Sequence, residues 1–150
     1  MKIEDEIKQP KFQSEYHKLG VNLAFTANWF DRQITQKLKE FKLTSQQFNV
    51  LRILRGQYPN PATINLITER MLDKMSNASR LVDKLLTKGL VDRKTCPEDR
   101  RQVDIIITEK GQELLKKIDE HTKDWEAPLM TLSKQEATLM NDFLDRMRGN

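Results

Sequence analysis

The sequence predicts a mainly α-helical fold that carries one small β-hairpin. Over most of the chain, apolar residues recur every three or four positions, which is the spacing of amphipathic helices. One such helix stops at Gly89, where a left-handed residue can close it, and two short strands with a charged loop between them follow. Two helices, a tight turn and a hairpin form the pattern of a winged helix-turn-helix, so this fold is expected.

The composition limits the class of protein. The chain has 150 residues, of which 37% are hydrophobic and 32% charged, with a mean hydropathy of −0.69. This suits a single soluble domain, and no apolar run approaches the roughly 20 residues that cross a membrane. The first residues alternate in charge and do not resemble a secretory signal, and one cysteine excludes an internal disulfide. We therefore expect a cytoplasmic protein.

A long helix is predicted over about residues 12–41, and a second follows it. The first has apolar positions at Tyr16, Leu19, Leu23, Ala27, Phe30, Ile34 and Leu38, with Gly20 as a weak point. Thr44 and Gln47 have the spacing of a capping box and mark the start of the second helix. A glycine and two prolines in residues 56–61 end it.

The helix-turn-helix and the wing follow. A short helix is expected from Thr63 to Met71, and Asp73 is the predicted N-cap of the next helix. That helix has an apolar side formed by Ala78, Leu81, Val82 and Leu85. Strands are predicted at Val91 to Thr95 and at Gln102 to Thr108, joined by the loop 96–101.

The carboxy-terminal region reads as two more helices. One is expected to run from Glu109 through Trp125 to the disturbance at Pro128. Ser133 and Glu136 form a second capping box and begin the other. The first ten residues are expected to form a mobile arm.

The second helix of the helix-turn-helix has a polar, basic outer face that can enter the major groove of DNA. Its candidates for DNA contact are Lys74, Ser76, Asn77, Ser79, Arg80, Lys84 and Lys88. Ser76 and Asn77 are expected in the first turn, where asparagine can pair with adenine, and arginine can pair with guanine. Lys84 and Lys88, further along, are expected at phosphates. The alternative is a polar face that only contacts solvent.

The region from Asp73 to Gly111 resembles the winged helix-turn-helix of MarR-type (multiple antibiotic resistance regulator) transcriptional regulators. The similar residues are Ser79 to Leu85, Lys88 to Val91, Asp99 and Arg101 after Pro97, and Thr108 to Gly111, with a looser match from about Leu19 to Met147. The resemblance implies one domain over residues 1–150. Within it, about 44–108 would form the DNA-binding lobe, and about 12–41 and 109–148 the dimerisation helices.

The resemblance also implies roles in the wing. Arg101 would reach a neighbouring minor groove beside Arg100, and Asp99 would brace the loop. Arginine suits this role because it is planar, always charged and weakly hydrated. The alternative is a charged hairpin tip that prevents edge-to-edge aggregation.

Three aromatic residues are candidates for an effector pocket. The resembled family often binds a small aromatic or phenolic ligand between its lobes, and Trp29, Phe41 and Phe48 are predicted to help line such a pocket. The alternative is ordinary core packing.

The sequence indicates neither an enzyme nor a metal site. It has no glycine-rich phosphate loop, no nucleophile elbow and no cluster of cysteine and histidine, so no cofactor and no metal are expected. Cys96 lies among basic residues, but the amino-terminal cysteine of oxidant-sensing relatives is missing, which argues against redox sensing.

We therefore expect a homodimeric, sequence-specific DNA-binding regulator, a ligand-responsive repressor on a pseudo-palindromic operator. Such an operator follows from a two-fold dimer. The net charge of +4 permits DNA binding without indicating it. The alternatives are a winged-helix module that binds another protein and a DNA-binding protein without sequence preference.

Overall fold

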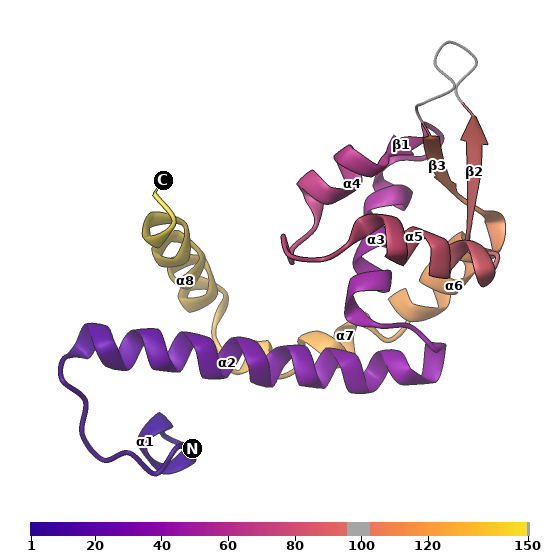
Figure 1. Cartoon of the computed structure of the whole chain (residues 1–150). Coiled ribbons are helices and arrows are strands. Elements are labelled where there is room, and N and C mark those ends of the chain that lie inside the picture. Colours follow the sequence, from indigo (N-terminus) through magenta and orange to yellow (C-terminus); the bar gives the residue numbers. More distant parts are fainter. Residues whose placement is uncertain (96–102, 150) are drawn as a thin grey trace.

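A computed structural model describes residues 1–95 and 103–149, and it shows a mainly helical chain (Figure 1). The helical elements are α1 (Ile3–Glu6), α2 (Glu15–Leu38), η1 (Lys39–Phe41), α3 (Ser45–Gln57), α4 (Ile64–Arg70), α5 (Ala78–Thr87), α6 (Glu109–Asp119), α7 (Thr122–Glu126), η2 (Leu129–Thr131) and α8 (Lys134–Met147). The strands are β1 (Ala62–Thr63), β2 (Val91–Thr95) and β3 (Val103–Ile107). The predicted fold class, mainly α with a β-hairpin, is confirmed.

The ends of α2 and α3 follow from local side-chain chemistry. Ser14 caps α2 by accepting a hydrogen bond from the His17 amide at 3.1 Å, so this helix begins slightly later than predicted. The predicted capping box of α3 is confirmed, since Thr44 Oγ1 accepts from the Gln47 amide at 3.1 Å and Gln47 Oε1 from the Thr44 amide at 3.2 Å. Between the helices, Lys42 has a left-handed backbone with φ of 55°.

The prediction that Asp73 caps the second helix of the helix-turn-helix is wrong. Asn77 caps α5, because its Oδ1 accepts a hydrogen bond from the Arg80 amide at 3.0 Å. Asp73 instead closes the turn before the helix, where its carboxylate accepts from the Met75 amide and the Ser76 hydroxyl, each at 3.0 Å. Both residue types are good caps, and the cap at Asn77 begins the helix at Ala78, which lies in the core.

Gly89 ends α5 as predicted. Its φ is 68°, and its amide donates to the Leu86 carbonyl at 2.8 Å, while the Leu90 amide donates to the Leu85 carbonyl at 3.0 Å. This pair of bonds is a Schellman motif, and buried Leu90 supplies the apolar contact that accompanies it.

The sheet has three antiparallel strands in the order β1-β3-β2, one more than predicted. In the additional pairing, Ala62 lies opposite Ile105 and Thr63 opposite Asp104. Two residues are too few to show the alternation that identifies a strand, so this pairing has no signal in the sequence.

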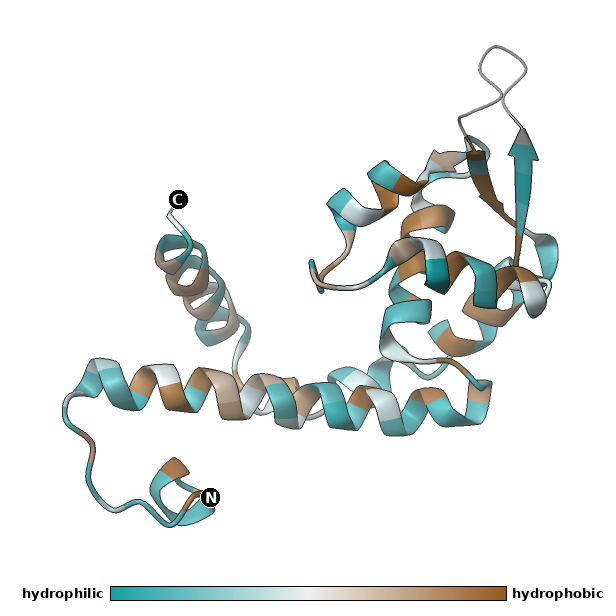
Figure 2. Cartoon of the chain, viewed as in Figure 1, coloured by the Kyte–Doolittle hydropathy of each residue, from teal (hydrophilic) through white to brown (hydrophobic). Residues whose placement is uncertain are grey.

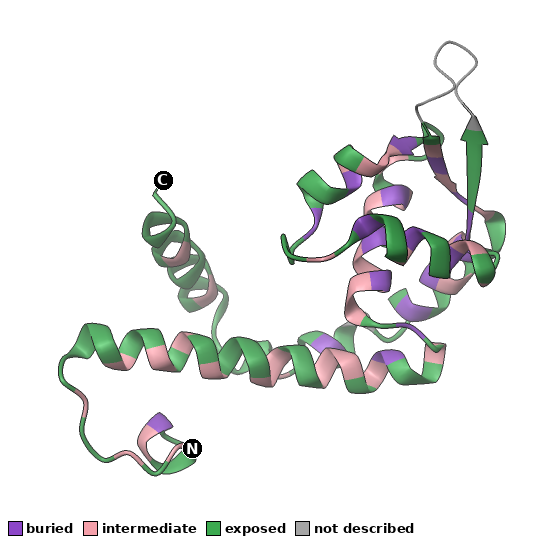
Figure 3. Cartoon of the chain, in the orientation of Figure 1, coloured by how far each residue is buried: buried purple, intermediate pink, exposed green. Residues whose placement is uncertain are grey.

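The core lies in one lobe, the winged lobe, which contains the end of α2, α3 to α6 and the sheet (Figure 3). Its fully buried side chains include Leu38, Leu51, Leu54, Ile67, Leu85, Ile105 and Leu115. The predicted continuous helix from Glu109 to Trp125 is interrupted at residues 120–121. The turn brings Trp125 of α7 against Phe48, with the ring centroids 5.6 Å apart and the planes at 69°.

The other end of the molecule is not buried. The first half of α2 lies beside α8, which stands apart from the winged lobe and has no buried residue (Figures 1 and 2). Their apolar side chains remain exposed, including Tyr16, Leu19, Leu139, Met140, Phe143 and Met147. An open groove of about 480 Å³ runs between the two helices.

The first ten residues are not a free arm. They contain the helical turn α1, in which Ile3 is buried, and Lys18 Nζ of α2 lies 2.6 Å from Glu4 Oε1. The hydrogen bond from Lys18 lowers the pKa of the Glu4 carboxyl. Charged residues dominate this segment, so apolar periodicity alone did not predict its contact with α2.

Gly111 is expected to tolerate no side chain. A Cβ there would lie 2.3 Å from the Leu90 carbonyl oxygen and 2.7 Å from Ile107 Cγ1. Gly111→Ala should therefore lower the free energy of unfolding by about 1–3 kcal/mol, measured by urea unfolding at fixed protein concentration.

Gly56→Ala in α3 is the matched control, because a Cβ there meets nothing within 4 Å. Alanine favours the helix, so this variant should gain about 0.5–1 kcal/mol. Equal unfolding midpoints for Gly111→Ala and the parent chain would contradict the packing described here.

Candidate nucleic-acid interface

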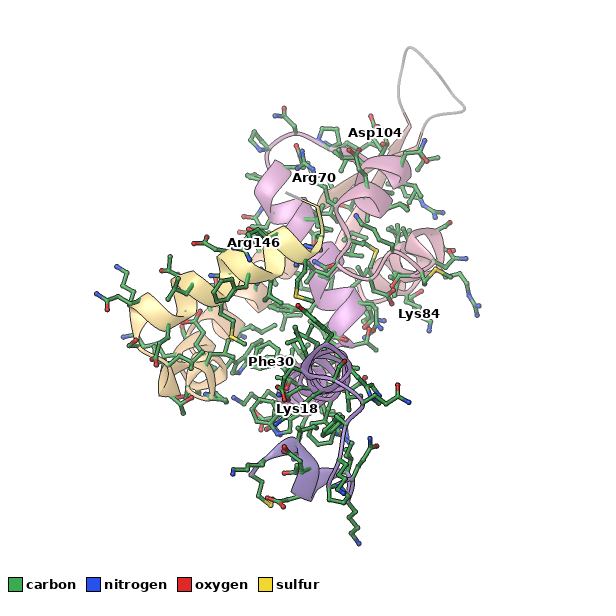
Figure 4. The ribbon with its side chains drawn as sticks, turned by 90° about the vertical axis from the view of Figure 1, so that its left-hand side faces the viewer. Lys18, Phe30, Arg70, Lys84, Asp104 and Arg146 are labelled. Atoms are coloured by element: carbon green, nitrogen blue, oxygen red, sulfur yellow. The ribbon has the colours of Figure 1, made fainter. Side chains whose placement is uncertain are left out.

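The outer face of α5 presents unpaired polar and cationic side chains. Ser79, Arg80 and Lys84 are exposed, and within the described part of the chain no hydrogen bond or ion pair is made by their side chains. Lys84 lies on the outer side of the lobe, away from α8 (Figure 4). Buried Val82 and Leu85 fix the opposite face, so α5 can present these groups to DNA while remaining packed.

Three candidates lie before the helix rather than in its first turn. Asn77 is the cap residue, and its Oδ1 is occupied by the Arg80 amide, which leaves its side-chain amide nitrogen for a base. Ser76 donates its hydroxyl hydrogen to Asp73, and Lys74 Nζ donates to the Glu69 carbonyl. The expectation of Ser76 and Asn77 within the first turn is therefore corrected. Asn77 is the N-cap of α5, and Ser76 precedes it.

Lys88 differs from Lys84 although both lie on one side of α5. Its ammonium donates to the carbonyl of Lys42 and, at 3.1 Å, to Oε1 of Gln47, whose side chain is buried. Lys88 is thus bonded within the protein, whereas the Lys84 ammonium is free to meet a phosphate.

Arg93 of β2 forms an ion pair with Asp83 of α5. Both side chains are about half exposed, so the pair adds little stability, but it links the first strand of the wing to the helix. Cys96, Asp99, Arg100 and Arg101 lie outside the described residues, and their roles stay predictions.

A cavity of about 630 Å³ lies between α2, the winged lobe and the segment from α7 to η2. It is lined by Ala27, Phe30, Asp31, Ile34, Ser45, Phe48, Asn49, Arg52, Leu72, Trp125, Glu126 and Leu129. Aromatic and apolar walls with a few polar groups are typical of small-molecule sites. The Arg52 guanidinium lies 5.7 Å from the centroid of the Phe48 ring, at the edge of this cavity.

Of the three aromatic residues predicted for this pocket, Phe48 lines it. Trp29 lies instead in a separate hollow between α1 and α2, with Phe25 and Ile3. The Phe41 ring packs beside His121, with centroids 6.0 Å apart. Sequence reasoning missed Phe30 and Trp125, whose helical spacing indicated only that they face inward.

Asn49 connects the cavity to the helix-turn-helix. Its Oδ1 accepts a hydrogen bond from the Leu72 amide at 2.9 Å, and both residues line the cavity. Leu72 begins the turn that leads to α5. One side chain of the cavity wall is therefore hydrogen-bonded to the turn that precedes α5.

Other site types find no support within residues 1–95 and 103–149. These residues contain no group of three histidine, cysteine, aspartate or glutamate side chains placed to hold a metal ion. No helix among them is long and apolar enough to cross a membrane.

Comparisons with known proteins agree with this geometry. Residues 43–103 match the model of the MarR family. The chain is 28% identical over 134 residues to the HTH-type transcriptional regulator MhqR of Bacillus subtilis, covering 89% of this chain and 91% of the relative.

Two solved structures share the fold. A mutant of MarR from E. coli complexed with operator DNA matches with a TM-score of 0.78 and 22% identity, over 91% of this chain and 98% of that one. An organohalide-sensing transcriptional regulator in its 2,4-dichlorophenol-bound form matches with a TM-score of 0.81 and 19% identity, over 93% and 85%.

The cap role of Asn77 can be separated from a role in reading bases. Asn77→Ala should lose about 1 kcal/mol of stability because α5 loses its cap. Asn77→Ser keeps a capping oxygen and should stay within a few tenths of a kcal/mol of the parent chain, as measured by urea unfolding.

The serine variant then isolates recognition. It should bind a selected DNA site more weakly and bind scrambled DNA unchanged, as measured by fluorescence anisotropy. Equal affinity of the serine variant and the parent for the selected site would remove Asn77 from the interface.

Proposed function

The chain belongs to the MarR family of DNA-binding transcriptional regulators, and we propose that it acts as a homodimer on a pseudo-palindromic operator. The observation that carries this proposal is the division of the molecule into two faces. A packed lobe presents the free groups of α5, while α8 and the first half of α2 leave an apolar surface uncovered. A DNA-binding lobe at about residues 44–108 and dimerisation helices at about 12–41 and 109–148 fit this division.

A second copy of the chain is the proposed cover of the apolar surface. Tyr16, Leu19, Met140, Phe143 and Met147 are each 44–86% exposed, and all five, together with Leu23, line the groove between the two helices. Monomeric proteins rarely expose a contiguous patch of this kind. A two-fold axis through it would place two α5 helices on one side of DNA, about 34–36 Å apart or a multiple of this.

On each half-site, Arg80, Ser79 and the amide nitrogen of Asn77 are proposed to meet base edges. Lys84 would contact a phosphate, with Lys74 and Ser76 beside the start of the helix. Arg100 and Arg101 of the wing, braced by Asp99, are proposed to reach the flanking minor groove. The proposed place of action is the cytoplasm.

The cavity beside Phe48 and Trp125 is the proposed effector site. Its aromatic walls suit a flat phenol or aromatic acid, and the Arg52 guanidinium can pair with a phenolate or carboxylate. The dichlorophenol in the structure of similar fold supports this ligand class. An occupant that changes the Asn49–Leu72 bond would shift the position of α5 and release DNA, so the proposed mode is repression relieved by ligand.

Phe143→Asp in α8 tests the dimer. This residue is 51% exposed in the single chain and lines the groove that the second copy is proposed to cover. A dimer of the variant would have to bury the new carboxylate, so the sedimentation coefficient should shift to that of a monomer. Its near-ultraviolet circular dichroism should stay that of a folded winged lobe.

Met75→Asp is the control, since Met75 is 92% exposed but lies on the winged lobe, and it should stay dimeric. A parent chain that sediments as a monomer at micromolar concentration contradicts the proposed function. Equal affinity for selected and scrambled DNA would favour a DNA-binding protein without sequence preference. The absence of affinity for both DNAs would favour a module that binds another protein.

Single-tryptophan variants test the effector site with 2,4-dichlorophenol as the probe. In Trp29→Phe, the remaining Trp125 lines the cavity, and its emission should fall as the probe binds. In Trp125→Phe, Trp29 lies outside the cavity and its emission should change far less at equal probe concentration. Parallel titration curves in the two variants would place the ligand elsewhere.

A further inference from the structure

A lysine at the C-terminal end of α5 is hydrogen-bonded to the segment that leads from α2 into α3. Lys88 Nζ donates to the carbonyl of Lys42, at the end of η1, and to Oε1 of Gln47 in the first turn of α3. We propose that Lys88 is a positioning residue that holds α5 at a fixed angle to α2 and so sets the half-site spacing that the dimer accepts. This inference rests on the proposed dimer.

The acceptors of Lys88 are themselves fixed in place. Lys42 has φ of 55° and ψ of 34°, a conformation that residues other than glycine rarely adopt. Its amide donates to the Lys39 carbonyl at 3.0 Å, and the Leu43 amide donates to the Leu38 carbonyl at 3.2 Å. These bonds close the end of α2 and η1, so the Lys42 carbonyl keeps one direction.

Gln47 supplies the second acceptor from inside the protein. Its side chain is only 4% exposed, and its Oε1 already accepts from the Thr44 amide at 3.2 Å. An amide oxygen has a second lone pair, which Lys88 occupies at 3.1 Å. The ammonium thus adds a second donor to the capping box of α3, and its loss would leave one lone pair of the Gln47 oxygen without a donor.

The same end of α5 is also held from the side of α6. Lys110 Nζ donates to the Lys88 carbonyl at 2.9 Å, and Thr108 Oγ1 donates to the Gly89 carbonyl at 2.8 Å. These bonds join α5 to the start of α6 and so stay within the winged lobe. The Lys88 side chain bonds this end of α5 to Lys42, which caps η1 just after the long helix α2, so it acts on the angle between α5 and α2.

The angle between α2 and α5 is important because the two helices have different proposed functions. The first half of α2 contributes to the proposed dimer surface, and α5 meets DNA. A rotation of α5 relative to α2 is repeated in the second copy, so it changes the separation of the two recognition helices twice over. Lys84 lies one turn earlier on the same side of α5 and has no such bond, which makes it the natural control.

The test compares Lys88→Met with Lys84→Met on operators of different spacing. The probe is a site selected from random DNA with the parent protein, together with versions in which one base pair is added or removed at its centre. The parent should prefer its own spacing by about tenfold or more, given that one mismatched position costs this much. Lys88→Met should reduce the preference to about threefold or less, while the dependence of affinity on salt keeps its slope.

Lys84→Met should do the opposite. It should keep the spacing preference and lower the slope of log affinity against log salt by about two, because two phosphate contacts are lost per dimer. If Lys88→Met lowers the salt slope and leaves the spacing preference intact, Lys88 is a phosphate contact and the proposal is overturned. No change in either quantity overturns it as well.

A distance measurement without DNA tests the role of Lys88 if Lys88→Met does not fold. It also serves if the parent chain selects no DNA site. Spin labels at Lys84→Cys of α5 and Gln36→Cys of α2, in a Cys96→Ser chain diluted with unlabelled protein, report the distance between the two helices within one copy. Lys88→Gln should broaden or shift this distance distribution. An unchanged distribution overturns the role of Lys88, whereas failure of the parent chain to select DNA counts only against the proposed function.

Discussion

The burial of the apolar face of α5 is the interaction on which the rest of the structure depends. This helix has ten residues, fewer than an isolated helix needs to be stable in water. It persists because Val82 and Leu85 are fully buried against the core of the winged lobe, and because Asn77 and Gly89 complete its ends. That packing turns Ser79, Arg80 and Lys84 outward together, so the surface proposed to read DNA is a consequence of the core.

The second constraint is that one chain leaves the apolar side chains of α8 and of the first half of α2 uncovered. The winged lobe encloses its side chains, while α8 contributes none to the core. The cavity beside Phe48 and Trp125 lies where the packed lobe meets α2, and Asn49 and Lys88 bond across the elements that meet there. The long helix α2 links two of these features, because its first half lines the apolar groove beside α8 while Ala27, Phe30 and Ile34 line the cavity. A regulator needs such a link between the proposed dimer surface and the proposed ligand site.

The sequence predicted the features that local chemistry determines. The capping boxes at Thr44 and Ser133, the left-handed Gly89 and the β2–β3 hairpin were all confirmed, because neighbours in the chain decide them. Features that depend on distant partners were not predicted. Asn77 rather than Asp73 caps α5, next to Ala78 in the core, β1 exists through its pairing with β3, and Phe48 meets Trp125 only in the folded chain. The ammonium of Lys88 was expected at a phosphate because no sequence pattern indicates its bond to Lys42, which lies far away along the chain.

Two copies of the chain are proposed to present their α5 helices to one side of DNA. Hydroxyl-radical footprinting of a site selected from random DNA, together with the mass of the complex from sedimentation, tests it directly. Two chains should bind each site and protect two regions centred about 10–10.5 base pairs apart, or a multiple of this. One chain on one protected region would contradict it.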